Sequence, residues 1–181
     1  VLRKAALRCD WTNSLEREAM KTLGLDIGGA NLKAAHTDGG SCSKAFPLWK
    51  QPHTLADQLP MLARHFPRFD RVAVTMTADL CDCFESKRQG VNHVLHATEE
   101  LAGARSVEVW STAGCFVKPH EARDRTMECA AANWHALARY VASLYPDGPT
   151  LLIDVGSTTT DIVHLRDGRV EAKGLTDTQR L

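Results

Sequence analysis

The sequence predicts an α/β fold in which a mixed sheet with flanking helices is followed by the start of a second lobe. Short apolar segments with strand character alternate with segments of helical periodicity along the 181 residues. Two pairs of strands are separated by short turns rich in small and polar residues, which is typical of hairpins. Strands that alternate with helices and also form hairpins favour a mixed sheet.

The first hairpin is predicted from residues 22–27 and 32–36. Gly28, Gly29 and Asn31 lie between these strands, and glycine and asparagine tolerate the positive φ angles that tight turns often need. The two strands are therefore expected to pair with each other.

The middle of the chain alternates between helices and strands. Residues 54–66 carry apolar side chains at three-to-four spacing and favour a helix, although Pro60 removes one backbone donor from it. A short buried strand is expected at residues 71–75, followed by a polar loop and a helix that runs to about His96. The next strand is expected at residues 106–110.

A longer helix is expected over residues 121–144, because apolar residues share one of its faces. These residues are Met127, Ala131, Trp134, Ala138, Val141 and Tyr145. The segment 146–149, Pro-Asp-Gly-Pro, ends this helix. Residues 150–155 and 160–165 then form a second predicted hairpin.

This order of elements divides the chain into three parts. Residues 1–19 are expected to be an N-terminal extension, either a genuine helix or an artefact upstream of a true start at Met20. Residues 20–149 form the first lobe, and residues 150–181 open a second, truncated lobe. A lobe needs roughly 100 residues to bury an adequate core, and only 20 residues follow Asp161. We therefore expect a fragment of a longer protein, with little catalytic activity of its own.

Composition argues against several classes of partner. Lys and Arg number 22, as do Asp and Glu, so the formal net charge is zero and binding to nucleic acid or to an anionic membrane is not expected. The apolar stretches fall short of the ~20 residues that span a bilayer, and no secretory signal is visible near the N-terminus. A cytoplasmic location is therefore expected, and the sequence does not indicate an oligomeric state.

The six cysteines raise the alternative of a metal site. A zinc site would draw on Cys81, Cys83 and a nearby histidine, but one residue separates these cysteines where structural zinc sites favour two to four. Small buried side chains in a reducing compartment are the favoured interpretation.

The two predicted hairpins share a pattern of residues. At an offset of 128 residues, Asp26 falls on Asp154 and Gly28 on Gly156, and a later histidine and glycine coincide as well. This distance is too long for a solenoid repeat and suits two related lobes that open with the same hairpin. One such turn is usually only a tight turn, whereas two at corresponding positions favour a shared function.

Both turns are suited to binding phosphate. Gly28, Gly29 and Gly156 carry no side chain, so that an anion can approach the backbone N–H groups closely. The other candidate phosphate ligands are Asn31, Lys33, Ser157, Thr158, Thr159 and Thr160. Asp26 and Asp154 end the leading strands, where carboxylates can hold Mg²⁺ directly or through its waters. The sequence thus predicts a small phosphorylated substrate bound together with magnesium.

Several segments resemble the hydantoinase/oxoprolinase-like branch of the actin-like ATPase superfamily, and within it the tetrahydromethanopterin-linked one-carbon transfer pathway proteins. These segments are residues 25–33 (LDIGGANLK), 47–50 (PLWK), 74–84 (VTMTADLCDCF), 132–134 (ANW) and 152–161 (LIDVGSTTTD). The resemblance extends from about Lys21 to the last residue, although Ala78 stands where a glycine is expected after Thr77. It implies an actin-like (ribonuclease H-like) mixed sheet and a ligand bound between two lobes.

The resemblance also implies a reaction in methanofuran biosynthesis. An aminomethylfuran methyl diphosphate is condensed with the phenol of γ-glutamyltyramine, and diphosphate is released. Mg²⁺ and oriented N–H donors would stabilise the charge that develops on the leaving group. Because a phenol has a pKa of about 10, a base assists its attack, and Asp161 and Asp79 are the candidates.

Two other functions remain open. An ATP-dependent small-molecule kinase or hydantoinase/oxoprolinase-type hydrolase of the same superfamily would need an adenosine-binding glycine motif in the second lobe. A non-catalytic nucleotide-binding module would bind Mg-ATP and release little product. Diphosphate release and ADP formation distinguish these functions.

Overall fold

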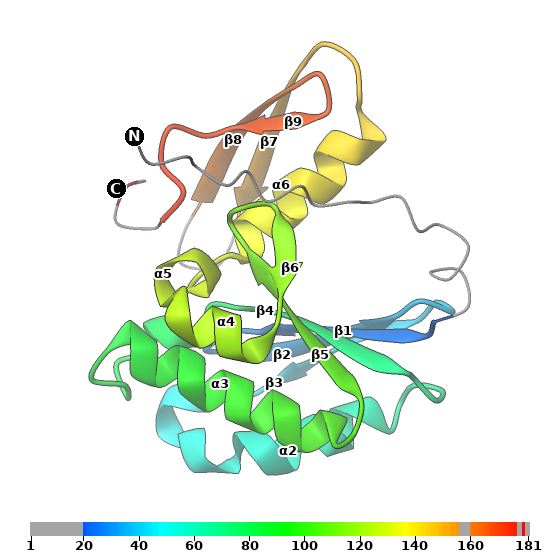
Figure 1. Ribbon diagram of the computed structural model, residues 1–181, viewed down its shortest axis with the longest axis vertical. Coiled ribbons are helices and arrows are strands. Elements are labelled where there is room, and N and C mark those ends of the chain that lie inside the picture. The colour runs from blue at the N-terminus through cyan, green and yellow to red at the C-terminus, as the bar shows by residue number, and fades with distance from the viewer. Residues whose placement is uncertain (1–19, 156–159, 177–178, 180–181) are drawn as a thin grey trace, which may run out of the picture.

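The computed structural model describes residues 20–155, 160–176 and 179, which form a six-stranded sheet, a separate three-stranded sheet and the helices around them (Figure 1). The larger sheet has the order β3-β2-β1-β4-β5-β6. Its strands are β1 (Thr22–Ile27), β2 (Asn31–His36), β3 (Ser41–Ala45), β4 (Arg71–Met76), β5 (Ser106–Ser111) and β6 (Cys115–Val117). The smaller sheet has the order β7-β8-β9 and contains β7 (Pro149–Val155), β8 (Thr160–Arg166) and β9 (Arg169–Glu171).

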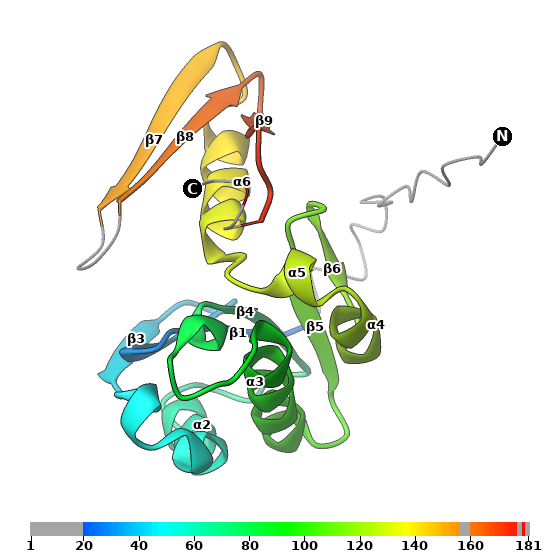
Figure 2. The same ribbon diagram turned by 90° about the vertical axis from the view of Figure 1, so that its left-hand side faces the viewer.

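Helices lie on both sides of the larger sheet. They are η1 (Leu48–Lys50), η2 (Pro52–Thr54), α2 (Leu55–Ala63), η3 (Ala78–Leu80), α3 (Lys87–Ala102), α4 (Pro119–Asp124), α5 (Thr126–Cys129) and α6 (Asn133–Leu144). Figure 2 shows α2 and α3 beneath the larger sheet and α6 above it. Helix α6 contacts strands of both sheets and so connects the two parts of the chain.

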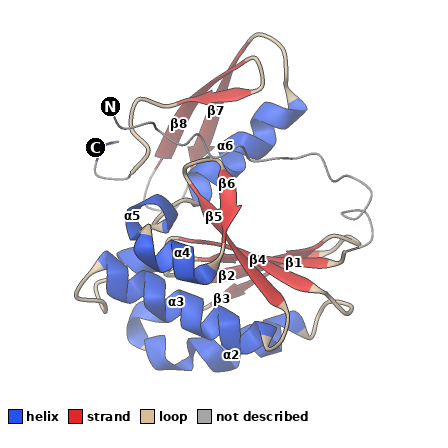
Figure 3. Cartoon of the chain, in the orientation of Figure 1, coloured by secondary structure: helices blue, strands red, loops and turns tan. Residues whose placement is uncertain are grey.

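The larger sheet is mixed. Strand β1 pairs antiparallel with β2 and parallel with β4, and β4 pairs parallel with β5 (Figure 3). The predicted α/β class, a mixed sheet with flanking helices, is confirmed. The strands predicted from the sequence are all present, whereas β3, β6 and β9 were not predicted, because β3 is largely polar and the other two have three residues each.

Alternation along β1 decides which side chains reach the open face of the sheet. Leu23, Leu25 and Ile27 are buried in the core that the sheet forms with α2 and α3, whereas Gly24 and Asp26 point to the other face. A shift of one residue in register would exchange the two sets and bury a carboxylate in an apolar core. The hydrophobic pattern therefore places Asp26 on the face that α6 covers in part.

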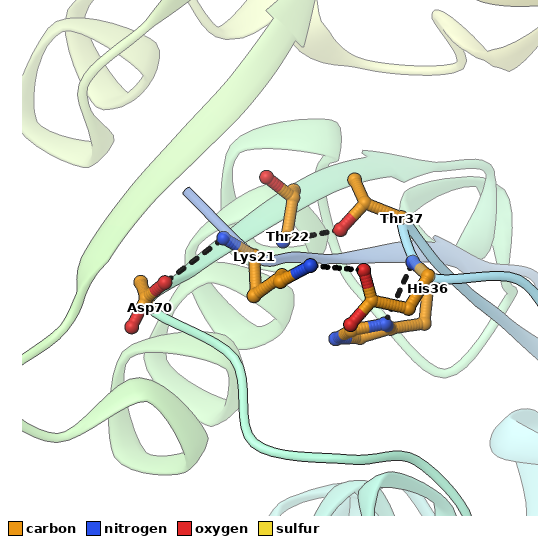
Figure 4. Close-up of polar contacts among 6 residues, drawn as sticks. Lys21, Thr22, His36, Thr37 and Asp70 are labelled. Atoms are coloured by element: carbon orange, nitrogen blue, oxygen red, sulfur yellow. Dashed lines mark hydrogen bonds and ion pairs between the residues drawn. The ribbon is translucent and has the colours of Figure 1, made fainter. Parts of the chain in front are cut away.

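Polar contacts fix the start of β1 (Figure 4). The backbone N–H of Lys21 donates to Asp70 Oδ2 at 2.9 Å, and the Lys21 ammonium forms an ion pair with Asp38. His36 Nδ1 accepts a hydrogen bond from the Asp38 N–H at 3.0 Å. These contacts hold the end of the β1–β2 hairpin that lies opposite its turn.

The single helix predicted over residues 121–144 is wrong, because the chain forms α4, α5 and α6 there instead. Ala131 adopts a left-handed φ of 47°, which a continuous right-handed helix cannot contain. The N–H of Ala131 donates to Asp79 Oδ1 at 3.2 Å, so a side chain from a distant loop supports the break. The apolar periodicity continued across it because residues on both sides are buried, including Cys129 and Ala138.

Two helix ends also differ from the expectation. Helix α3 runs past His96 to Ala102 and ends at Gly103, whose φ of 60° suits a glycine. The helix expected over residues 54–66 is shorter: α2 begins at Leu55, contains Pro60 in its interior and ends at Ala63. Within the described part of the chain, no helix has the length and apolar character that crossing a membrane requires.

Candidate functional site

The turn between β1 and β2 is tight and closely packed. The Gly28 N–H donates to the Asn31 carbonyl at 3.0 Å. The expectation of positive φ angles in this turn is wrong, because none of Gly28, Gly29 and Asn31 has one. Glycine is needed for space instead, because a Cβ on Gly29 would lie 2.6 Å from Cys81 Sγ.

The carbonyl groups of this turn face the segment that follows β3. The Gly29 carbonyl accepts a hydrogen bond from the Leu48 N–H at 2.8 Å, and the Ala30 carbonyl accepts one from the Phe46 N–H at 2.9 Å. The N–H groups of Gly29 and Ala30 donate to no acceptor among the residues that the structure describes. These two N–H groups are therefore available as donors to an anion.

The contact between Gly29 and Cys81 leads to a prediction. Replacement of Gly29 with alanine is expected to lower the free energy of unfolding by roughly 1–3 kcal/mol, because the added methyl group overlaps the Cys81 sulfur. Chemical denaturation measures this change. The double variant with Cys81→Ala removes the sulfur and is expected to regain most of the loss; a double variant as unstable as Gly29→Ala would contradict the packing that we describe.

Asp26 and Lys33 lie directly opposite each other in the β1–β2 hairpin. Lys33 Nζ donates to Asp26 Oδ2 at 3.1 Å. The other carboxylate oxygen, Oδ1, is buried and has no hydrogen-bond partner among the described residues. On the other side of β1, Asp26 is in register with Thr75 of β4, whose buried hydroxyl also has none in that part of the chain. One oxygen of Asp26 therefore remains for a ligand or a metal ion.

The second hairpin repeats this register. Asp154 lies opposite Asp161 in the β7–β8 pair, and these positions follow Asp26 and Lys33 at the same offset of 128 residues. The two hairpins therefore share the same cross-strand register. The one difference at this pair is that Asp161 stands where the first hairpin has Lys33.

Two carboxylates, those of Asp154 and Asp161, face each other across the second hairpin. Carboxylates directly opposite in an antiparallel pair repel each other unless a cation or a donor lies between them. Thr160, a further candidate phosphate ligand, begins β8 opposite Val155. Gly156, Ser157, Thr158 and Thr159 lie outside the described residues.

Asp26 and Asp154 remain the candidate metal ligands of this site. Within residues 20–155, 160–176 and 179, no three His, Cys, Asp or Glu side chains converge on one metal position. Mg²⁺ keeps several waters and commonly binds through one or two carboxylates plus phosphate oxygens. Asp26, whose Oδ1 has no partner among the described residues, and Asp154 are carboxylates of the kind that such a site uses.

Asp79, the other candidate base, occupies a buried position. It lies in η3 with 3% of its surface exposed, and its Oδ1 accepts the hydrogen bond from the Ala131 N–H. A Cβ on Gly90 would lie 2.6 Å from the Asp79 Cα, so α3 also packs tightly against this residue. These contacts hold the connection between α5 and α6 in place.

A pocket of about 1030 Å³ lies between the open face of the larger sheet and α6. Asp26, Lys33 and Thr75 line it from the sheet, and Arg139 and Tyr140 line it from α6. Its lining includes Trp110 and Phe116, whose rings meet edge to face with centroids 5.0 Å apart, and the small residues Gly24, Ala35 and Ala73.

Sequence reasoning missed the aromatic residues and Arg139. The signal for Arg139, Tyr140 and Ser143 was present, because their spacing of one and three residues puts them on the helix face away from Ala138 and Ala142. No comparable signal marks Trp110, which is one more apolar residue in a buried strand.

Two of the described cysteines have raised pKa values. Burial, together with the neighbouring Cys83, Asp79 and Asp82, raises the pKa of Cys81 to about 11. Burial and the Glu128 carboxylate raise the pKa of Cys129 to about 12. Both thiols are therefore protonated at neutral pH, which supports the interpretation of small buried side chains.

Residues 70–181 match the family model Hydantoinase/oxoprolinase. The chain belongs to this family. It is also 37% identical over 162 residues to the (4-{4-[2-(gamma-L-glutamylamino)ethyl]phenoxymethyl}furan-2-yl)methanamine synthase of Methanocaldococcus jannaschii, a match that covers 88% of this chain and 47% of that protein. The chain spans about half the length of this relative.

Two solved structures of the Ppx/GppA family from Aquifex aeolicus are also similar. One matches with a TM-score of 0.49 and 17% identity, covering 84% of this chain and 49% of the other. A type II variant of that phosphatase matches with a TM-score of 0.48 and 15% identity, covering 84% of this chain and 50% of the other.

Proposed function

We propose that this hydantoinase/oxoprolinase family member is part of a cytoplasmic transferase that condenses an aminomethylfuran methyl diphosphate with the phenol of γ-glutamyltyramine and releases diphosphate. The name of the 37% identical relative describes a molecule with these furan, phenoxy and γ-glutamyl parts. The observation that carries the proposal is the shared register of the two hairpins, each with an aspartate beside a glycine-containing turn.

The first hairpin supplies groups suited to a diphosphate. The N–H groups of Gly29 and Ala30 are available as donors, and Lys33 adds a positive charge next to Asp26. Asp26 and Asp154 would hold Mg²⁺, which when bound neutralises the negative charge of the leaving group. The remaining phosphate ligands in this proposal are Gly28, Asn31, Gly156, Ser157, Thr158, Thr159 and Thr160.

The contacts of the two candidate bases favour Asp161. Asp79 is buried and accepts the Ala131 N–H, so a substrate reaches it only if that connection opens. Asp161 is half-buried at the end of the second hairpin, opposite Asp154. In the proposed reaction its carboxylate takes the proton of the phenol as the phenolic oxygen attacks the furan-bound carbon.

The pocket beside Asp26 suits aromatic substrates. Trp110, Phe116 and Tyr140 offer ring faces and edges, and Gly24 and Ala73 leave room above the sheet. Furan and phenol rings are flat and largely apolar, and they contact such surfaces favourably. The pocket therefore supports substrates of the proposed kind.

The proposal is tested in a chimera in which this chain replaces the matching half of the Methanocaldococcus jannaschii relative. The chimera is expected to release diphosphate from the furan substrate only when γ-glutamyltyramine is present. Formation of ADP from Mg-ATP without this release would favour the kinase or hydrolase alternative. Tight binding of Mg-ATP with neither product would favour a non-catalytic module.

A further inference from the structure

Two cysteines lie close together in the segment between η3 and α3. Cys81 follows η3 directly, and Cys83 comes two residues later in irregular backbone. The Phe84 N–H donates to the Cys81 carbonyl at 3.1 Å, which closes a turn around Cys83. Such a turn brings the Cα atoms of its first and third residues within the distance that a disulfide spans. Both side chains are half-buried and remain accessible to solvent in part.

The two sulfur atoms already interact. The Cys81 thiol donates a hydrogen bond to the Cys83 sulfur. Burial, with the neighbouring Cys83, raises the pKa of Cys81 to about 11, so Cys81 keeps its proton at neutral pH and remains the donor. A disulfide requires side chains that point toward each other, and this hydrogen bond shows that they do. By contrast Cys129, a neighbour of Cys115, is fully buried.

Cys81 also supports the turn between β1 and β2. Its sulfur packs so closely against Gly29 that a Cβ on this glycine would lie 2.6 Å from it. The Leu48 N–H holds the Gly29 carbonyl at 2.8 Å, whereas the Gly29 N–H is one of the two donors that remain available to an anion. A movement of the Cys81 sulfur therefore leaves a gap beside Gly29 and removes a contact that fixes the direction of this N–H.

We propose that Cys81 and Cys83 form a reversible disulfide, and that its formation draws the Cys81 sulfur away from Gly29 and loosens the turn between β1 and β2. A covalent S–S bond is much shorter than a hydrogen bond between two sulfur atoms, so oxidation must move at least one of them. Disulfides in a reducing compartment are usually transient and sense redox conditions. The disulfide itself does not depend on the proposed function, whereas its effect on diphosphate binding rests on that function.

The oxidant is a disulfide of low molecular weight. The Cys83 thiolate attacks one sulfur of the oxidant and releases the other half as a thiolate, which leaves a mixed disulfide on Cys83. Cys81 then gives up its proton and attacks the Cys83 sulfur, and the second half of the oxidant leaves. The two cysteines together lose two protons and two electrons, and the oxidant is reduced to two thiols.

Mass spectrometry of the 181-residue chain tests whether the disulfide forms. Oxidised glutathione is expected to lower the mass of the chain by two hydrogen atoms, and dithiothreitol is expected to restore it. Proteolysis of the denatured, oxidised chain before Asp82 is expected to give two peptides that stay joined through Cys81 and Cys83. The variant Cys83→Ser keeps Cys81 against Gly29 and is expected to form no disulfide.

Backbone amide NMR tests the link to the turn. The Gly29 amide is expected to shift when the disulfide forms, while the amides of β9 stay unchanged, and Cys83→Ser is expected to show no such shift. The control Cys115→Ser changes a half-buried cysteine of β6 and is expected to respond as the parent does. Isothermal titration calorimetry is expected to show that oxidation lowers the affinity for magnesium diphosphate about 10-fold, the contribution of one hydrogen bond to a charged group.

Three outcomes would overturn the proposal. The first is a parent chain that forms no disulfide or keeps a stable glutathione adduct, and the second is a disulfide that persists in Cys83→Ser. The third is a Gly29 amide that does not move when Cys81 and Cys83 are joined. If the Gly29 amide shifts on oxidation but neither form of the chain binds diphosphate, the redox inference holds and the proposed function is wrong.

Discussion

Replacing Asp26 with asparagine is expected to weaken the binding of magnesium diphosphate by this chain about 10- to 100-fold. Asp26 Oδ1 is buried without a partner among the described residues, so it is the oxygen left to contact a metal ion beside the turn. Contacts to charged groups contribute on the order of 1.5–3 kcal/mol, which corresponds to this range of affinity. Isothermal titration calorimetry at saturating magnesium measures the change.

The sign of this effect is expected to depend on magnesium. Without the metal, the Asp26 carboxylate repels a polyanion. It also forms an ion pair with Lys33, which is then less available to the polyanion. Asp26→Asn is then expected to bind diphosphate as well as the parent chain, or better. The control Asp38→Asn lies at the other end of the same hairpin and is expected to change neither affinity. An equal loss with and without magnesium would show that Asp26 acts on the fold rather than on a metal.

The stability of the chain is expected to fall as the pH drops from about 6.5 to about 4, and His135 is expected to cause much of the fall. His135 is 5% exposed in α6, and its ring contacts those of Trp110 and Trp134, with centroids 5.8 Å and 5.3 Å away. Burial, with the positive charge of Arg139, lowers its pKa from 6.5 to about 4.

The direction follows from proton binding. Between the two pKa values the unfolded chain binds a proton that the folded chain does not, so unfolding becomes more favourable as the pH falls. The full difference is roughly 3 kcal/mol and is reached near pH 4. Urea denaturation at pH 7 and pH 5 measures this dependence.

A variant separates His135 from other acid-sensitive groups. His135→Phe keeps the aromatic contacts and removes the titrating ring, so its loss of stability between pH 7 and pH 5 is expected to be clearly smaller than that of the parent. His53→Gln serves as the control, since His53 is exposed. A parent and a His135→Phe variant with the same pH dependence would contradict a buried neutral imidazole.

Local patterns in the sequence were sufficient to predict both hairpins. Alternation placed Asp26 and Asp154 at the ends of their strands, and the shared offset of 128 residues indicated that the hairpins are equivalent. The structure adds their register, in which Asp26 faces Lys33 and Asp154 faces Asp161. The length of a hairpin turn determines which residues pair across the strands. The pairs Asp26–Lys33 and Asp154–Asp161 could therefore be predicted from the sequence.

Features that depend on contacts between distant segments were not predictable. The break before α6 requires Asp79 to meet the Ala131 N–H across 52 residues, and no local pattern signals that meeting. The need for glycine at position 29 comes from Cys81, which the sequence places far away. The apolar pocket beneath α6 has the same origin, because the helix crosses the sheet only after this break.

The central claim is that both hairpins bind one diphosphate together with magnesium, and backbone amide NMR tests it most directly. Titration of the ¹⁵N-labelled chain with magnesium diphosphate is expected to shift the amides of Gly29 and Ala30 in the first hairpin and of Asp154 and Asp161 in the second, with one common dissociation constant. Shifts that appear in only one hairpin, or that are the same without magnesium, would contradict the claim.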